Sequence, residues 1–291
     1  ALEEHIGKPL GLSAVQAAEA VIRVANSRMA GAIRLVSIER GFDPEQFVAM
    51  PFGGGGSLHT GALIKEVGLA NALVPRYHGV TSALGCVIAD MRHDFVHTLN
   101  DMVDSIDISS LDEEMVRTDT EGRRLLNESG VTLDELNTVF ELDMSYLGQT
   151  HTVPVAIPVT VSNKTTGVTK ETLRKAFETQ YEKTYGRLLS GIGIRILNLR
   201  TSVIGKRPKF DLSLLAPEDG GSIEASRTGE RDVFVDGEWH KAAIFDRLSL
   251  PIDAEIPGPA LLEQPDTTIF IDPDLYGKVD RFGNIVISRK G

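Results

Sequence analysis

The residues best suited to chemistry in this sequence are four consecutive glycines, Gly53–Gly56, within the stretch FGGGGSLHTG. Without side chains, their backbone N–H groups can come very close to a ligand. A short apolar run precedes them and a predicted helix follows, so the loop stands at a helix N-terminus, where partial positive charge favours an anion. The pattern predicts a site for a phosphate or a nucleoside; the alternative is a tight turn that lets the helix pack closely on a strand.

Two side chains that follow the glycines are further candidates for ligand contacts. Ser57 can cap the helix or donate a hydrogen bond to a phosphate oxygen, and His59 lies near enough to face a ligand bound at the loop. For His59 alone, the alternative is a structural histidine bonded to the backbone. The spacing matches neither the P-loop G-x-x-x-x-G-K-[ST] nor the dinucleotide-binding G-x-G-x-x-G, so we assign neither kind of site.

Local motifs identify no catalytic residue, and the catalytic residues stay unknown at this level. Cys86 has apolar neighbours in a predicted helix, which indicates a buried structural thiol rather than a nucleophile. His93 and His97, with Asp90 and Asp94 nearby, suggest metal ligands. If they lie on a strand, however, Asp94 points away from both histidines. We therefore predict no metal site from the residues of this chain.

Hydrophobic periodicity gives the elements that must position the glycine loop. Ser13 followed by Gln16 is a capping-box signal that opens a long helix. Apolar runs before and after the loop predict two buried strands. The first ninety residues thus have the pattern of half of an α/β layer arrangement. In order, the predicted elements are a helix at about 13–39, a strand at 47–52, the glycine loop at 53–56, a helix at 58–67, a strand at 71–75 and a helix at 79–90.

Changes in pattern divide the chain into three segments, so the predicted fold is mixed α/β and α+β. Residues 1–92 carry the α/β pattern described above. Residues 93–215 form an α+β segment that includes a hairpin from 139–146 to 152–157. Residues 216–291 begin with a polar, Gly-containing stretch at 216–226 and continue as a small all-β module with turns such as Asp236-Gly237.

Composition excludes several classes of protein. The chain has 291 residues, 42% of them hydrophobic, which is enough for a sizeable core and more than one domain. A formal net charge of −11 argues against nucleic-acid and anionic-membrane partners. A single cysteine excludes an internal disulfide, and together with the lack of a signal-peptide pattern it favours a cytoplasmic location. No apolar run approaches the length of a membrane span.

The order strand, FGGGGSLH, helix, strand, PRYHGVTSALGCVIADMRHD resembles the hydantoinase A / 5-oxoprolinase family. That family also includes subunits of caprolactamase and of acetone and acetophenone carboxylases. The long first helix, the hairpin SYLGQTHTVPV, the helix FETQYEKTYGR and the closing GPALLEQPDTTIFIDPDLYGKVDRFGNIVI resemble the family in the same order.

The family is similar in fold to actin, Hsp70 and the sugar kinases, in which two ribonuclease-H-like lobes clamp ATP. The resemblance implies that 1–92 is a portion of the second lobe and that Gly53–Gly56 are its adenosine motif, with ATP and Mg²⁺ as cofactors. Nothing like the DxGGT phosphate loop of the family's N-terminal half occurs here. Phosphate and metal contacts are therefore expected mainly from that half, and the chain is expected to be a C-terminal part or a separate subunit.

The resemblance implies a subunit of an ATP-dependent cyclic-amide hydrolase, acting on hydantoin, 5-oxoproline or a related lactam by phosphorylation of the amide oxygen. The alternatives are a subunit of an acetone- or acetophenone-type carboxylase and a catalytically silent scaffold. The expected partners are the N-terminal half of the family fold and a hydantoinase B-type subunit in an oligomer. The chain alone is expected to be inactive.

Overall fold

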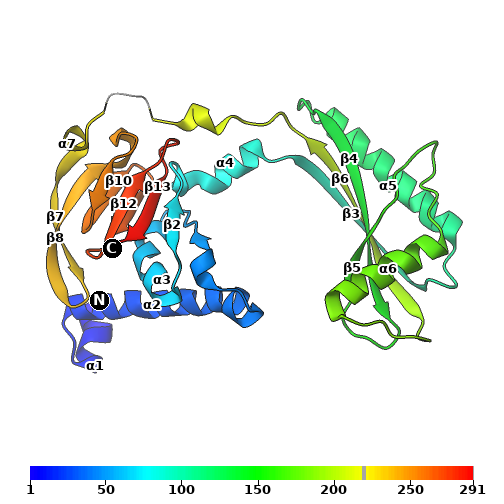
Figure 1. Ribbon diagram of the computed structural model, residues 1–291, viewed down its shortest axis with the longest axis horizontal. Coiled ribbons are helices and arrows are strands. Elements are labelled where there is room, and N and C mark those ends of the chain that lie inside the picture. The colour runs from blue at the N-terminus through cyan, green and yellow to red at the C-terminus, as the bar shows by residue number, and fades with distance from the viewer. Residues whose placement is uncertain (218–220, 291) are drawn as a thin grey trace. The chain divides into compact units, whose positions relative to one another are not determined.

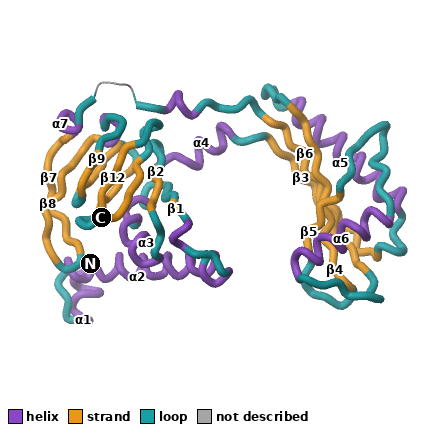
Figure 2. Tube along the Cα trace, viewed as in Figure 1, coloured by secondary structure: helices purple, strands orange, loops and turns teal. Residues whose placement is uncertain are grey.

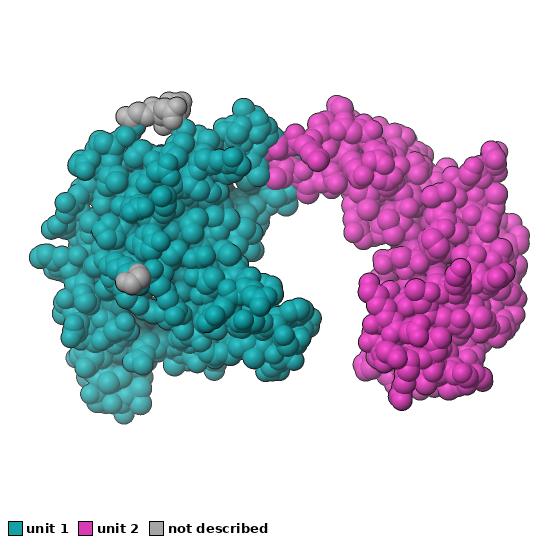
Figure 3. Space-filling view, viewed as in Figure 1, with its two compact units in different colours: residues 1–87, 211–291 teal, residues 88–210 magenta. Residues whose placement is uncertain are grey.

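The computed structural model describes residues 1–217 and 221–290, which form two compact units. Unit 1 combines Ala1–Val87 with Asp211–Gly291, and unit 2 is Ile88–Phe210 (Figure 3). Each unit has a hydrophobic core of its own. The mixed α/β and α+β class expected from the sequence is confirmed. Among the described residues, no helix is both long and apolar enough to span a bilayer.

The helices of unit 1 precede and follow the glycine loop. The predicted capping box is confirmed, because Ser13 Oγ accepts from Gln16 N at 3.3 Å and Gln16 Oε1 accepts from Ser13 N at 3.0 Å. Gly41, with φ of 81°, ends the short 3₁₀ turn after the long helix. The longer α-helices at this end of the chain are α2 (Ala14–Val36), α3 (Thr60–Val67) and α4 (Thr81–Ile88). A five-residue π-helix (Glu3–Gly7) and the three-residue α1 (Lys8–Leu10) precede them.

Two sheets form the body of unit 1 (Figures 1 and 2). In the five-stranded sheet, the order is β1-β2-β13-β12-β9, and β1 runs parallel to β2. Its strands are β1 (Val48–Ala49), β2 (Asn71–Val74), β9 (Glu255–Pro257), β12 (Leu275–Val279) and β13 (Ile285–Arg289). The four-stranded sheet has the order β11-β10-β8-β7, with strands β7 (Arg227–Val235), β8 (Glu238–Asp246), β10 (Ala260–Gln264) and β11 (Thr267–Ile271).

Residues 1–87 of the first predicted segment, 1–92, share one core with the last predicted segment, 216–291, while residues 88–92 belong to unit 2. Strand β13 pairs with β2, and Ile285 lies opposite Val74 in the register. Buried side chains of α3, of β2 and of both sheets pack together in one cluster. The all-β segment is therefore not packed as a separate body. Within the stretch expected to be a linker, residues 218–220 lie outside the described residues, and α7 (Ile223–Ser226) precedes β7.

Two predictions of burial were wrong. The apolar run around β1 was expected to be a buried strand, but Val48 is 55% exposed, because β1 is the last strand of its sheet and pairs on one side only within the described chain. Cys86 was expected to be a buried thiol, but it is exposed. Helix α4, which carries it, has no buried residue.

Unit 2 is an antiparallel sheet of order β3-β6-β4-β5 with two helices. The predicted hairpin is confirmed, since β4 and β5 pair antiparallel with Phe140 opposite Ile157. Side chains of the helices and the sheet form its core, with Phe140, Leu111 and Phe177 among them. The bounds are β3 (Met91–Met102), α5 (Ile108–Glu128), β4 (Glu135–Tyr146), β5 (Val153–Ile157), α6 (Lys170–Tyr185) and β6 (Ile194–Lys206).

Candidate functional site

The glycine loop lies at the carboxyl end of β1, beside the loop that follows β2. Because β1 and β2 are parallel, both loops leave the same edge of the sheet, which is where open α/β sheets bind ligands. The two loops are joined directly, since Gly53 N donates to His78 O at 2.7 Å. Gly53 has φ of 83°, a conformation that glycine adopts without strain.

A third segment, the turn between β10 and β11 together with the first residue of β11, holds both loops. Thr267 Oγ1 lies 3.0 Å from Gly54 O and 3.0 Å from His78 Nε2. Next to this contact the packing is very close, because a β-carbon on Gly79 would lie 2.0 Å from Asp266 Oδ2. The glycine loop is thus fixed from the strand β2 side and from the β10–β11 turn.

The outer face of the glycine loop is open. Gly54 and Gly55 are exposed. A β-carbon built on Gly53 or on Gly55 would meet no heavy atom within 4 Å, and one on Gly54 would meet only Asp266 O at 3.8 Å. The backbone of the loop is therefore not covered by packed side chains of the described residues, and the assignment of Gly53–Gly56 as cofactor-binding residues stays a prediction.

Ser57 and His59 are the side chains predicted to contact the cofactor, and in the structure one is buried and the other contacts helix α2. Ser57 is fully buried, and its Oγ has no hydrogen-bond partner among the described residues. His59 precedes α3, and its Nδ1 lies 2.6 Å from Asn26 Oδ1 of α2, so it links the two helices. Their contact with a cofactor also stays a prediction.

His78 is the residue of this site that the sequence reasoning missed. It is fully buried, and burial together with the positive charge of Arg247 lowers its pKa to about 4, so its imidazole is neutral at pH 7. Arg247 is itself fully buried, and burial and the neighbouring Arg76 lower its pKa to about 10. The sequence signal that could have identified His78 is its position directly before Gly79, in the loop after a predicted strand.

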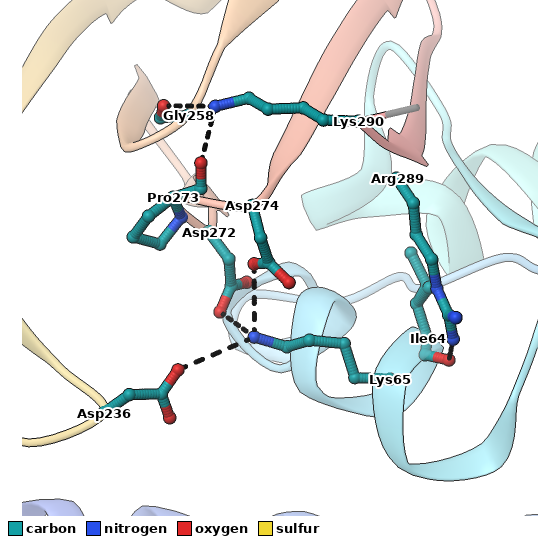
Figure 4. A network of polar contacts seen from close by, with 9 residues as sticks. All are labelled: Ile64, Lys65, Asp236, Gly258, Asp272, Pro273, Asp274, Arg289 and Lys290. Carbon is teal, nitrogen blue, oxygen red and sulfur yellow. Dashed lines mark hydrogen bonds and ion pairs between the residues drawn. The ribbon is translucent and has the colours of Figure 1, made fainter.

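Helix α3, which follows the glycine loop, is anchored by an ion-pair network (Figure 4). Lys65 Nζ lies 3.2 Å from Asp272 Oδ1, 3.4 Å from Asp274 Oδ1 and 3.9 Å from Asp236 Oδ2. Asp272 is 7% exposed, and this burial raises the pKa of its carboxyl group. The carboxylate presses against α3 so closely that a β-carbon on Gly61 would overlap it.

A groove of about 560 Å³ runs beside this network, between α2, α3 and β7. Its apolar wall includes Ile22, Leu58 and Phe234, and Asp272 and His59 also line it. Its volume is within the range of small-molecule pockets, about 300–1,000 Å³. The glycine loop itself does not line the groove.

Comparison with known proteins decides the family. Residues 1–95 match the family described as hydantoinase/oxoprolinase, and residues 109–286 match the hydantoinase/oxoprolinase C-terminal domain. The chain belongs to the hydantoinase/oxoprolinase family. The resemblance drawn from the sequence is thereby confirmed.

Relatives within the hydantoinase/oxoprolinase family align with nearly the whole chain. An uncharacterised protein of Methanocaldococcus jannaschii is 31% identical, over 98% of this chain and 39% of its own length. The caprolactamase alpha subunit of Pseudomonas jessenii is 26% identical, over 94% of this chain and 39% of its own.

Two solved structures have the same fold. The ATP-dependent caprolactamase from Pseudomonas jessenii aligns with a TM-score of 0.68 and 25% identity, over 100% of this chain and 42% of its own. Nucleotide-free acetone carboxylase aligns with a TM-score of 0.74 and 21% identity, over 99% and 42%. The chain thus spans about two-fifths of the length of these relatives.

Proposed function

We propose that this chain supplies one wall of the ATP site in an ATP-dependent cyclic-amide hydrolase, acting on hydantoin, 5-oxoproline or a related lactam. The observation that carries the proposal is the open backbone of Gly53–Gly55 at the carboxyl edge of the parallel strands β1 and β2. Backbone amides without side chains allow a nucleoside or a phosphate to approach closely. The family supports ATP as the nucleotide, because the caprolactamase is named as ATP-dependent.

Such an enzyme uses ATP to make an unreactive amide reactive. Transfer of the γ-phosphoryl group to the amide oxygen, with release of ADP, makes the carbonyl carbon more electrophilic. Water adds to that carbon, the ring C–N bond breaks as the nitrogen takes a proton, and hydrolysis of the resulting acyl phosphate releases phosphate and the open-chain acid. Catalysis of phosphoryl transfer is mostly positioning and electrostatic stabilisation, with Mg²⁺ neutralising developing charge. In this proposal Gly54–Gly56 position the nucleoside or the α-phosphate, while the phosphate and Mg²⁺ contacts come from other polypeptide.

The edge of the five-stranded sheet supports the need for further polypeptide. Strand β1 has no described neighbour on its outer side, and an unpaired edge invites another strand. Phe47, Val48, Met50 and Phe52 are each between 44% and 55% exposed along this edge, which is unusual for an isolated protein. The named relatives include an alpha subunit, which supports a multi-subunit assembly with a hydantoinase B-type partner.

The test is ATP hydrolysis by the reassembled enzyme with each class of substrate. We expect ATP turnover that depends on a hydantoin, on 5-oxoproline or on a lactam such as caprolactam. Turnover that depends instead on bicarbonate with acetone or acetophenone would identify a carboxylase subunit, the second candidate, which the acetone carboxylase beta subunit among the relatives favours. If the assembled enzyme did not bind ATP, the remaining hypothesis would be that this chain is a catalytically silent scaffold.

A single substitution tests whether the loop takes part. Gly55→Val adds a side chain on the open face without a clash, because a β-carbon at Gly55 meets nothing within 4 Å and its φ is −113°. We expect a KM for ATP at least about tenfold higher, with unchanged thermal stability. The matched control is Gly85→Ala in α4, where a β-carbon also meets nothing. An unchanged KM in Gly55→Val would remove the glycine loop from the ATP site.

A further inference from the structure

We propose that His78 is a positioning residue for the glycine loop, and that it acts through the hydroxyl group of Thr267. The proposal rests on the proposed function, because the loop is positioned to receive a nucleotide. No local motif singles out His78, and its side chain is fully buried against Thr267.

The contacts of His78 hold two consecutive residues of the loop. Its carbonyl oxygen accepts from Gly53 N at 2.7 Å, and its imidazole Nε2 reaches Thr267 Oγ1 at 3.0 Å. The same hydroxyl lies 3.0 Å from Gly54 O. One residue therefore fixes the first two glycines of the run through both its main chain and its side chain, and glycine has little conformational restraint of its own.

The direction of the hydrogen bonds follows from the number of protons. A hydroxyl group has one hydrogen, so Thr267 can donate to Gly54 O only if it accepts from His78 Nε2–H. The opposite tautomer, with the hydrogen on Nδ1, could donate to the Pro75 carbonyl, but it would make Nε2 an acceptor and take from Gly54 O its donor within this chain. We infer the Nε2–H tautomer, because it alone serves both contacts of Thr267 Oγ1.

The surroundings keep the imidazole neutral. The charged groups that face it are Arg247, in the segment after β8, and Asp266, in the β10–β11 turn. Arg76, in the same loop as His78, adds its charge beside Arg247. A proton on His78 would place a third positive charge in this buried region, which desolvation and Arg247 oppose.

The experiment separates loop order from nucleotide binding. Amide hydrogen exchange of residues 53–58 is measured by mass spectrometry in this chain, and the Kd for ATP is measured in the assembled enzyme. The variants are His78→Leu, Thr267→Val and the double variant, with His78→Gln as the conservative replacement, because its side-chain amide can donate to Thr267 but does not titrate.

We expect His78→Leu and Thr267→Val each to accelerate exchange in residues 53–58 and to weaken ATP binding by about tenfold, as the loss of one hydrogen bond predicts. The double variant should be no worse than the single ones, because both remove the same chain of bonds. His78→Gln should restore both readouts. In ¹⁵N spectra of the imidazole, the hydrogen should reside on Nε2 between about pH 6 and 8.

Three results would overturn the inference: unchanged exchange in both single variants, additive effects in the double variant, or a hydrogen on Nδ1. If exchange accelerates as expected while the unsubstituted assembly does not bind ATP, the positioning of the loop by His78 stands and the proposed function fails. Thr267→Val keeps the shape of the side chain, so the test survives even if His78→Leu does not fold.

Discussion

Lys65→Met should destabilise unit 1 by removing the partner of a buried carboxylate. Lys65 Nζ lies 3.2 Å from Asp272 Oδ1, and Asp272 is 7% exposed. At that separation the attraction is about 5 kcal/mol for an effective dielectric constant of about 20. Because the lysine side chain is 30% exposed and Met retains its apolar stem, we expect a net loss of about 2–3 kcal/mol in the free energy of unfolding at pH 7.

The loss should depend on pH, and its sign follows from Asp272. Burial already raises the pKa of Asp272 in the folded state, and removal of Lys65 would raise that pKa further. A folded state that holds its proton more tightly than the unfolded state loses stability as pH rises from the unfolded pKa through the raised folded pKa. Lys65→Met should therefore cost more at pH 8 than at pH 5.

Urea unfolding monitored by the fluorescence of Trp239 measures this loss. Trp239 is the single tryptophan of the sequence, and it lies in β8 of unit 1 with its ring centroid 5.4 Å from that of Phe234. The matched background is Asp272→Asn, in which Lys65→Met should cost less than about 1 kcal/mol, because the carboxylates that remain, Asp274 and Asp236, have side chains 58% and 81% exposed and are screened by water. Equal costs in both backgrounds and at both pH values would refute the reasoning.

Three further predictions concern the same unit. Gly79→Ala should lower the free energy of unfolding by about 1–3 kcal/mol, because its β-carbon would lie 2.0 Å from Asp266 Oδ2. The control Gly85→Ala should not destabilise the protein, because a β-carbon there meets nothing within 4 Å. Equal effects of the two substitutions in urea unfolding would contradict this prediction. Ser13→Ala should cost about 1 kcal/mol through loss of the capping box, measurable as a lower thermal midpoint; no shift would mean that the cap is not formed in solution. The pKa of His78 is lowered to about 4, so the folded state resists protonation. Up to about 3 kcal/mol of the free energy of unfolding should therefore be lost as pH falls from about 6.5 to 4. A series of urea titrations at different pH values measures this loss, which His78→Gln should lack.

Local features of the structure could be predicted from the sequence. The capping box of Ser13 and Gln16 and the hairpin of β4 and β5 both depend on residues close together in the chain. The glycine run was predicted to form a loop before a helix, and it does, with a short 3₁₀ turn (Gly56–Leu58) before α3. In each case the physical cause is a backbone conformation or a hydrogen bond within a few residues.

Contacts between distant residues could not be predicted in the same way. The two partners that Thr267 Oγ1 contacts, Gly54 and His78, are 213 and 189 residues away in the chain. They meet because β13 pairs with β2 and carries the C-terminal strands into the first sheet. Hydrophobic periodicity reports which residues of an element are apolar, and it contains no information on strand order.

By itself, the sequence determined the family, the mixed α/β and α+β class and the loop at Gly53–Gly56. Tertiary structure alone decided that the apolar run at β1 lies at an exposed sheet edge, that Cys86 faces solvent and that His78 is buried beneath the glycine loop. The physical reason is that burial depends on what packs against a residue. Thr267, from the other end of the chain, packs against His78, whereas β1 has no described strand on its outer side and α4 has no buried residue.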